Sequence, residues 1–189
     1  MPGIKGGLLS IGATGAIGKG KKSRMGIPVE APAPPPTPFE IGSAAIDRPT
    51  HFGIVQNTVL NKANPAELAG IITEVNVFVN TAGEDNLFVG IFFNTGGDNW
   101  TCRSAANEAV PGGAGLKTIS GLALDCQVGD CVAIFWKNAS PDMTADGEDD
   151  TYISYSVGNL CSPASSGAFP DWIAAGKHTV SLGALGETL

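Results

Sequence analysis

The sequence predicts an all-β protein built as a β-sandwich. Charged residues make up only 15% of the chain, while 26 glycines and 13 prolines interrupt it at short intervals. A helical bundle or coiled coil would need many more Glu, Lys, Arg and Leu residues at helical spacing. A hydrophobic content of 43% also excludes a wholly disordered chain. At 189 residues, the chain is long enough for one domain with a substantial core.

Short β-rich runs follow one another between turn signals. The clearest spans residues 71–80, where Val75, Val77 and Val79 recur at the two-residue period of a strand and Phe78 falls on the opposite face. Residues 86–94 are almost continuously apolar, which favours a strand in the middle of a sheet, and 100–104 is its expected partner. Further strands are expected at 52–60, 116–124, 131–137, 151–157 and 177–183.

The connections between these runs are rich in turn residues. Residues 61–67 predict a loop with one helical turn, and the polar stretch 138–150 predicts another loop. The turn around Gly129 predicts a hairpin between the strands that flank it. Eight or so short strands favour a sandwich, and the jelly roll is a common eight-stranded form. Strand spacing leaves an immunoglobulin-like arrangement open as the alternative.

The chain divides into three segments by composition. Residues 1–27 carry eight glycines and form an arm that cannot fold alone. Residues 28–38 contain six prolines and predict an extended linker, because proline favours the polyproline II conformation. The remaining residues, 39–189, form the predicted β-sandwich domain.

Charge follows the same division. The formal net charge is −7, yet five basic residues and no acid lie before residue 28, while all eighteen acids lie after it. An acidic body repels nucleic acid, so we do not expect nucleic acid as a partner of the body.

The arm is interpreted as a segment that becomes ordered along a partner. A membrane span is not expected, because the apolar stretch 6–18 is shorter than the roughly 20 residues needed to cross a bilayer and contains several glycines. Glycines permit close approach of the backbone, and apolar side chains supply anchors between basic ones. The anchoring residues are expected to be Lys5, Leu8, Leu9, Ile11, Ile17, Lys19, Lys21, Lys22 and Arg24.

The sequence offers no catalytic residues, cofactor or metal. Gly12, Gly15 and Gly18 resemble a dinucleotide-binding turn, but the strand and helix that such a turn requires cannot fit before the prolines. His51 and His178 lie near no cysteine or acidic cluster. The acidic residues between Asp142 and Asp150 depart from the known calcium-loop pattern, so a solvated loop is the preferred interpretation.

The four cysteines lack the paired C-x-x-C spacing of a zinc site. They are Cys102, Cys126, Cys131 and Cys161. Cys126 and Cys131 could face each other across the turn at Gly129, which leaves one disulfide open. Reduced, partly buried thiols are the preferred interpretation because no secretion signal is recognised.

The tryptophans raise an alternative function. Trp100, Trp136 and Trp172 could form a platform that stacks on sugar rings, although Trp136 lies in an apolar run typical of a core strand. The alternative to a structural role is therefore a carbohydrate-binding adhesin module that recognises host surface glycans, with loop 138–150 contributing.

Several short motifs of the body are similar to those of a known domain family. They are Ala45–Arg48, Leu60–Ala66, Gly70–Val75, Thr118–Leu122, the turn Val128–Asp130 and the terminal stretch Val180–Thr188. In this order they resemble a small jelly-roll-like β-sandwich domain that recurs in phage and prophage virion proteins. The motifs are turns and core positions, so the resemblance concerns the fold and carries no catalytic residue.

That resemblance implies a non-enzymatic structural protein of the virion, assembled in the host cytoplasm. We expect a capsid decoration, a head spike or a tail-associated component that contacts other virion proteins through residues 1–38. A homo-oligomer is expected, with a trimer among the candidates.

Overall fold

The computed structural model describes residues 33–51, 56–82, 85–110, 113–137, 139–144, 154–171 and 178–189. The chain divides into two compact units, Met1–Pro34 and Pro35–Leu189, and nearly all described residues belong to the second. Every regular element in the described ranges is a β-strand, and no helix there could cross a membrane. The predicted all-β class is confirmed.

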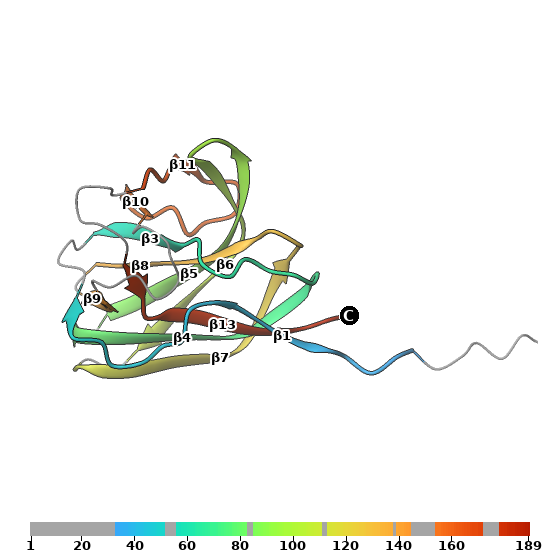
Figure 1. Ribbon diagram of the computed structural model, residues 1–189, viewed down its shortest axis with the longest axis horizontal. Coiled ribbons are helices and arrows are strands. Elements are labelled where there is room, and N and C mark those ends of the chain that lie inside the picture. Colours follow the sequence, from blue (N-terminus) through green and yellow to red (C-terminus); the bar gives the residue numbers. More distant parts are fainter. Residues whose placement is uncertain are drawn as a thin grey trace, which may run out of the picture. The chain divides into compact units, whose positions relative to one another are not determined.

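The strands form two sheets that pack face to face (Figure 1). One is a seven-stranded sheet of order β1-β13-β4-β9-β12, with β2 paired to β9 and β7 paired to β4. The other is a six-stranded sheet of order β10-β3-β8-β5-β6-β11. The strand bounds are β1 Pro38–Gly42, β2 Thr50–His51, β3 Asn57–Asn61, β4 Gly70–Ala82, β5 Asp85–Gly96, β6 Asn99–Val110, β7 Gly115–Cys126, β8 Cys131–Trp136, β9 Ala139–Thr144, β10 Ser154–Val157, β11 Ser166–Ala168, β12 Thr179–Val180 and β13 Leu182–Glu187.

The pairing of eight strands is nested in the manner of a jelly roll. β5 pairs with β6, β4 with β7, β3 with β8 and β2 with β9, all antiparallel. Successive pairs alternate between the two sheets, so the chain wraps around the core as one long folded ribbon. β9 then joins β4, and β8 joins β5, which completes two four-stranded jelly-roll sheets. This pairing excludes the immunoglobulin-like alternative.

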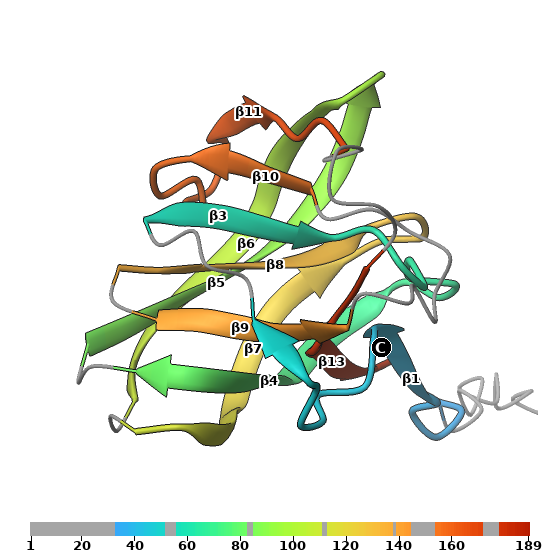
Figure 2. The ribbon, with the colours of Figure 1, turned by 60° about the vertical axis from the view of Figure 1, so that its left-hand side comes forward.

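The remaining strands extend these sheets. β13 pairs with β4, β1 pairs with β13 and β12 pairs with β9, while β10 and β11 are added to the two edges of the six-stranded sheet. β10 and β11 nevertheless lie side by side at the top of the molecule (Figure 2), because the six-stranded sheet curls strongly.

The hairpin predicted around Gly129 is wrong. The turn exists, since Asp130 N donates to the Gln127 carbonyl at 3.0 Å and Gly129 has a φ of +87°. However, β7 pairs with β4 and β8 pairs with β3 and β5, so this turn carries the chain from one sheet to the other. Turn residues determine the local bend, but they do not determine which strands then pair. The helical turn expected in 61–67 is also absent, because these described residues form no helix.

The core between the sheets comes from the inward faces of both. The predicted alternation on β4 is correct, because Val75, Val77 and Val79 are fully buried while Phe78 is half-buried. These valines meet apolar side chains of the six-stranded sheet, namely Leu87, Val89, Ile91, Val132, Ile134 and Trp136. Each fully buried Val, Leu or Ile side chain contributes roughly 1.5–3 kcal/mol.

A second apolar cluster covers the opposite face of the six-stranded sheet. It consists of Leu60, Phe92, Trp100, Cys102, Cys131, Ala133, Cys161 and Phe169. Phe169 and Cys161 belong to the segment 158–171, which we call the cover segment because it lies over this face of the sheet. Gly90 makes the close approach possible, because a Cβ there would lie only 3.3 Å from the Sγ atoms of Cys102 and Cys161 and 2.7 Å from the Phe92 ring.

Candidate functional site

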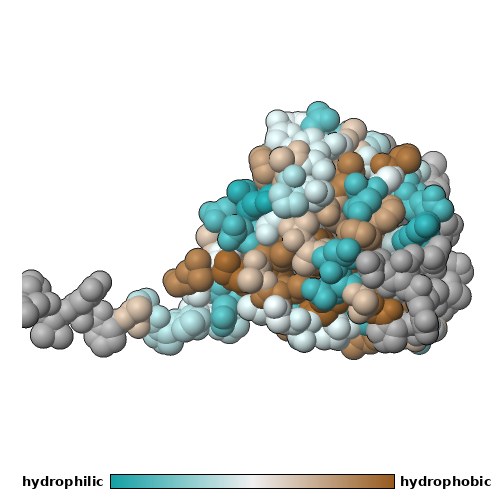
Figure 3. Space-filling view, turned by 180° about the vertical axis from the view of Figure 1, so that it is seen from behind, coloured by the Kyte–Doolittle hydropathy of each residue, from teal (hydrophilic) through white to brown (hydrophobic). Residues whose placement is uncertain are grey.

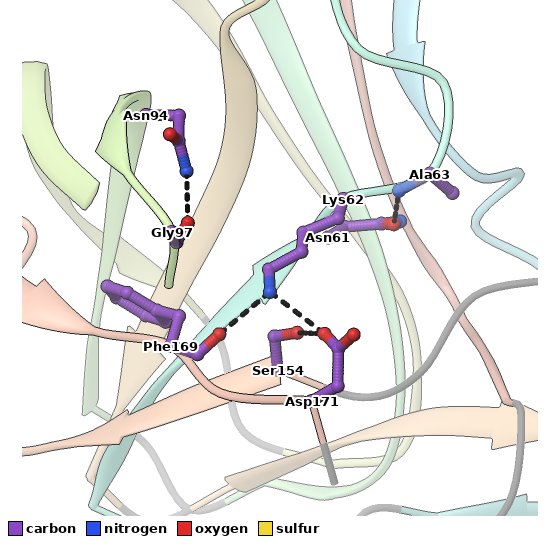
Figure 4. Close-up of polar contacts among 8 residues, drawn as sticks. All are labelled: Asn61, Lys62, Ala63, Asn94, Gly97, Ser154, Phe169 and Asp171. Atoms are coloured by element: carbon purple, nitrogen blue, oxygen red, sulfur yellow. Dashed lines mark hydrogen bonds and ion pairs between the residues drawn. The ribbon is translucent and has the colours of Figure 1, made fainter. Parts of the chain in front are cut away.

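A polar network fastens the cover segment to the edge of the six-stranded sheet (Figure 4). Lys62, which directly follows β3, donates from Nζ to the Phe169 carbonyl at 2.7 Å and to Asp171 Oδ1 at 2.9 Å. Ser154 at the start of β10 donates from Oγ to the same Asp171 Oδ1 at 2.9 Å. A backbone bridge between Ser154 and Asp171 adds a main-chain link. The end of β3, the start of β10 and the end of the cover segment are therefore tied together at Asp171.

The network holds Asp171 as a carboxylate. Partial burial opposes ionisation, but the hydrogen bonds from Lys62 and Ser154 outweigh it and hold the pKa of Asp171 below its ordinary value of 3.8. Both donors use Oδ1, and Oδ2 accepts no hydrogen bond from the described residues. The Asp171 side chain keeps 40% of its surface exposed. Asp171 therefore presents a fixed, charged oxygen to the solvent.

The network is built to hold its members in place, and its geometry does not suit nucleophilic catalysis. Ser154 is fully buried, so its hydroxyl cannot reach a substrate. Lys62 already carries two hydrogen bonds from Nζ, which also lies 6.0 Å from the centre of the Trp100 ring. No group of three or more His, Cys, Asp or Glu side chains in the described part of the chain is arranged to hold a metal ion.

An open groove adjoins this network. It lies between β10 and the end of the cover segment, which start to pair at Ser154 and Asp171 but then separate. The groove encloses a volume of about 360 Å³. We call it the β10 groove, and its lining residues are Tyr155, Ser156, Val157, Ala168, Pro170 and Asp171.

A separate ion pair stabilises the interior. Arg103 on β6 donates from Nε to Asp130 Oδ2 at 2.6 Å and from Nη2 to Oδ1 at 3.1 Å, and Gln127 N donates to Oδ2 at 2.8 Å. Asp130 has 1% of its side chain exposed, and the guanidinium lies 4.7 Å from the centre of the Phe93 ring. All of these contacts lie within the body. The pair therefore fixes the turn that carries the chain from β7 to β8, and it does not form a binding site.

All four cysteines are free and buried. Burial raises the pKa of Cys102 to about 11 and those of Cys126 and Cys131 to about 12, and it raises that of Cys161 as well. The disulfide left open between Cys126 and Cys131 is not formed. These thiols behave as small apolar side chains, since a thiol that remains protonated is a poor nucleophile and a poor metal ligand.

Most residues singled out by the sequence lie elsewhere. The nine anchoring residues between Lys5 and Arg24 lie outside the described residues, as do Trp172 and the acidic stretch 145–150. Trp100 and Trp136 are buried, with 8% and 3% of their surface exposed, so neither can stack on a sugar. His178 is buried in the body.

The β10 groove was missed because its residues carry no local motif. Lys62 and Asp171 are 109 positions apart, and neither lies in a charged run. Comparisons with protein-family models, with curated proteins and with solved structures each find no match. A proposal for the function therefore has to be argued from this chain's own sequence and structure.

Proposed function

We propose that this chain is a structural protein of a phage particle. Residues 1–38 attach it to other virion proteins, and the jelly-roll body is displayed on the particle as a head decoration, a spike or a tail-associated component. The chain forms a homo-oligomer, with a trimer among the candidates, and it is assembled with the virion in the host cytoplasm.

The separation of charge along the chain is the observation that supports this proposal. All five basic residues of the first 27 positions are followed by a proline-rich stretch and then by an acidic body. Within the described body, Lys62 and Arg103 are paired with acids, and Arg48 and Lys117 are buried. Lys137 is the one exposed cation in the described ranges that is in no such pair. Because the two parts carry opposite charge, the basic segment favours an acidic partner surface, which the acidic body would repel.

The way the body is closed also supports attachment through its preceding residues. β1 pairs with β13, and the hydrogen bonds continue beyond the strands, since Thr37 N donates to Thr188 Oγ1 at 2.8 Å and Thr188 N donates to Thr37 O at 3.0 Å. The described residues before β1, 33–37, are exposed. Within the described residues, the pairing of β1 with β13 closes this edge of the body, which supports a role for the residues before 35 in binding a partner.

Deletion of residues 1–27 tests the proposal. We expect the shortened protein to keep the melting temperature of the full chain and to be missing from purified particles. Two full-length variants divide the effect: one replaces Leu8, Leu9, Ile11 and Ile17 by Ser, and the other replaces the five basic residues by Ser. Both should be incorporated less than the wild type. Incorporation of the shortened protein at the wild-type level would overturn the anchoring role.

A further inference from the structure

The β10 groove has the two kinds of surface that a small polar ligand requires. Tyr155, Val157 and Pro170 give it an apolar wall, while Asp171 and Ser156 contribute polar groups. Tyr155 is held by packing against the core between the sheets, and Val157 is 82% exposed. Binding sites for small molecules are typically concave, mostly apolar and equipped with a few convergent polar groups.

The carboxylate in the groove is preorganised. Lys62 and Ser154 fix Asp171 through Oδ1, which leaves Oδ2 to accept hydrogen bonds from a ligand. Phe169, two residues earlier, is fully buried and packs edge to face on Phe92, with ring centres 5.5 Å apart. The wall that carries Asp171 is therefore anchored at Phe169 and at Asp171 itself. A ligand would not have to order it, which lowers the entropic cost of binding.

The charge of the groove restricts the ligand. Among the described residues, no basic side chain lines it, so the described lining offers no partner to an anionic ligand such as a phosphate. The Lys62 ammonium lies 2.9 Å from Asp171 Oδ1 and largely offsets its negative charge, which weakens the attraction for a cationic ligand. What remains is an acceptor for neutral hydroxyl donors beside an apolar wall.

We propose that the β10 groove binds a neutral saccharide. The apolar C–H face of a sugar ring packs against Tyr155, Val157 and Pro170, and ring hydroxyls donate to Asp171 Oδ2. A volume of about 360 Å³ lies within the range of roughly 300–1,000 Å³ that is usual for small-molecule sites. The site differs from the tryptophan platform that the sequence suggested, because Trp100 and Trp136 are buried. It also goes beyond the proposed structural role, since the groove belongs to the body whatever the body is attached to.

The full-length protein can be tested on an array of neutral oligosaccharides from bacterial surfaces, followed by saturation-transfer NMR with the sugars that bind. Val157→Trp should block the groove, and Asp171→Asn should remove the fixed acceptor charge. Each change should weaken binding about tenfold or more, the loss expected when a charge-assisted hydrogen bond or the apolar contact disappears. Glu108→Gln, an exposed acid on β6 that does not line the groove, is the matched control and should bind as the wild type does.

The outcomes separate cleanly. Binding that is lost in both groove variants and kept in the control, while all three variants remain folded at the assay temperature, supports the site. Binding that survives Val157→Trp places the sugar elsewhere and overturns the proposal. No binding of any arrayed or free neutral sugar at millimolar concentration also overturns it. These results are independent of particle incorporation, so the structural role and the saccharide site can fail separately.

Discussion

Replacement of Phe169 by Ala should be among the most destabilising single changes in the body. The Phe169 ring is fully buried in the cluster under the cover segment and packs edge to face on Phe92. Its main chain is held at the same time, because Lys62 donates to its carbonyl and its own N–H donates to Asp98 O at 2.8 Å. These main-chain bonds limit how far the segment can collapse into the space left by the ring.

The expected loss is about 3–5 kcal/mol, the usual cost when a buried Phe becomes Ala and the cavity persists. For a domain of this size, each kcal/mol lowers the melting temperature by about 2–4 °C, so a fall of roughly 6–20 °C is expected. Urea unfolding followed by tryptophan fluorescence measures the free energy directly, and Trp100 reports from the same cluster.

Val157→Ala serves as the control for this measurement. Val157 is 82% exposed, so its truncation should change the free energy of unfolding by no more than about 0.5 kcal/mol. A loss below about 1 kcal/mol for Phe169→Ala would show that the cover segment is not fastened through this ring. That result would contradict the stabilising role of the second apolar cluster, and with it the rigidity of the wall that carries Asp171 in the β10 groove.

Three further predictions follow from polar and thiol groups. Asp130→Ala should cost about 1.5–3 kcal/mol in urea unfolding, because it removes the charge-assisted hydrogen bonds from Arg103, whose side chain keeps 30% of its surface exposed and can be rehydrated; a neutral result would contradict the role of this pair. The pKa of Asp171 is lower in the folded protein than the unfolded value of about 3.9. The stabilisation from its pairing with Lys62 is therefore complete above about pH 3.9 and is lost as the pH falls through the lower folded pKa. The difference in unfolding free energy between wild type and Asp171→Asn should therefore shrink below about pH 4, and a constant difference down to about pH 2 would argue against the pair. The four buried cysteines, with pKa values raised by burial, should react with a thiol reagent at about pH 8 only after unfolding in urea, and rapid labelling of the native protein would contradict their burial.

The strands with strong periodic signals could be predicted from the sequence, and the weak ones could not. β4 and β5 follow their apolar patterns closely, because burial on one or both faces imposes those patterns. β9 was expected to be a loop, because Ala139–Thr144 contains Pro141 and Asp142, which are rare in strands. Its pairing with β4, β2 and β12 is long-range, and local preference does not encode it.

The candidate site also depends on long-range contacts that local sequence preference does not encode. Trp136 was correctly expected in a core strand, since it ends an apolar run. Lys62, Ser154 and Asp171 meet only through tertiary contacts, because β10 pairs with β3 and the end of the cover segment bridges to Ser154. Figure 3 shows hydrophobic and hydrophilic residues interspersed on the surface seen from behind, so surface hydropathy on that face does not single out one site either.

Cryo-electron microscopy of particles purified from host cells that produce this chain with an epitope tag after Leu189 tests the central claim most directly. The proposed function predicts density for the jelly-roll body on the outside of the head or tail, repeated with the symmetry of its oligomer and connected to the particle through residues 1–38. Particles that contain no copy of the chain, or that bind it through the body with residues 1–38 turned away, would contradict it.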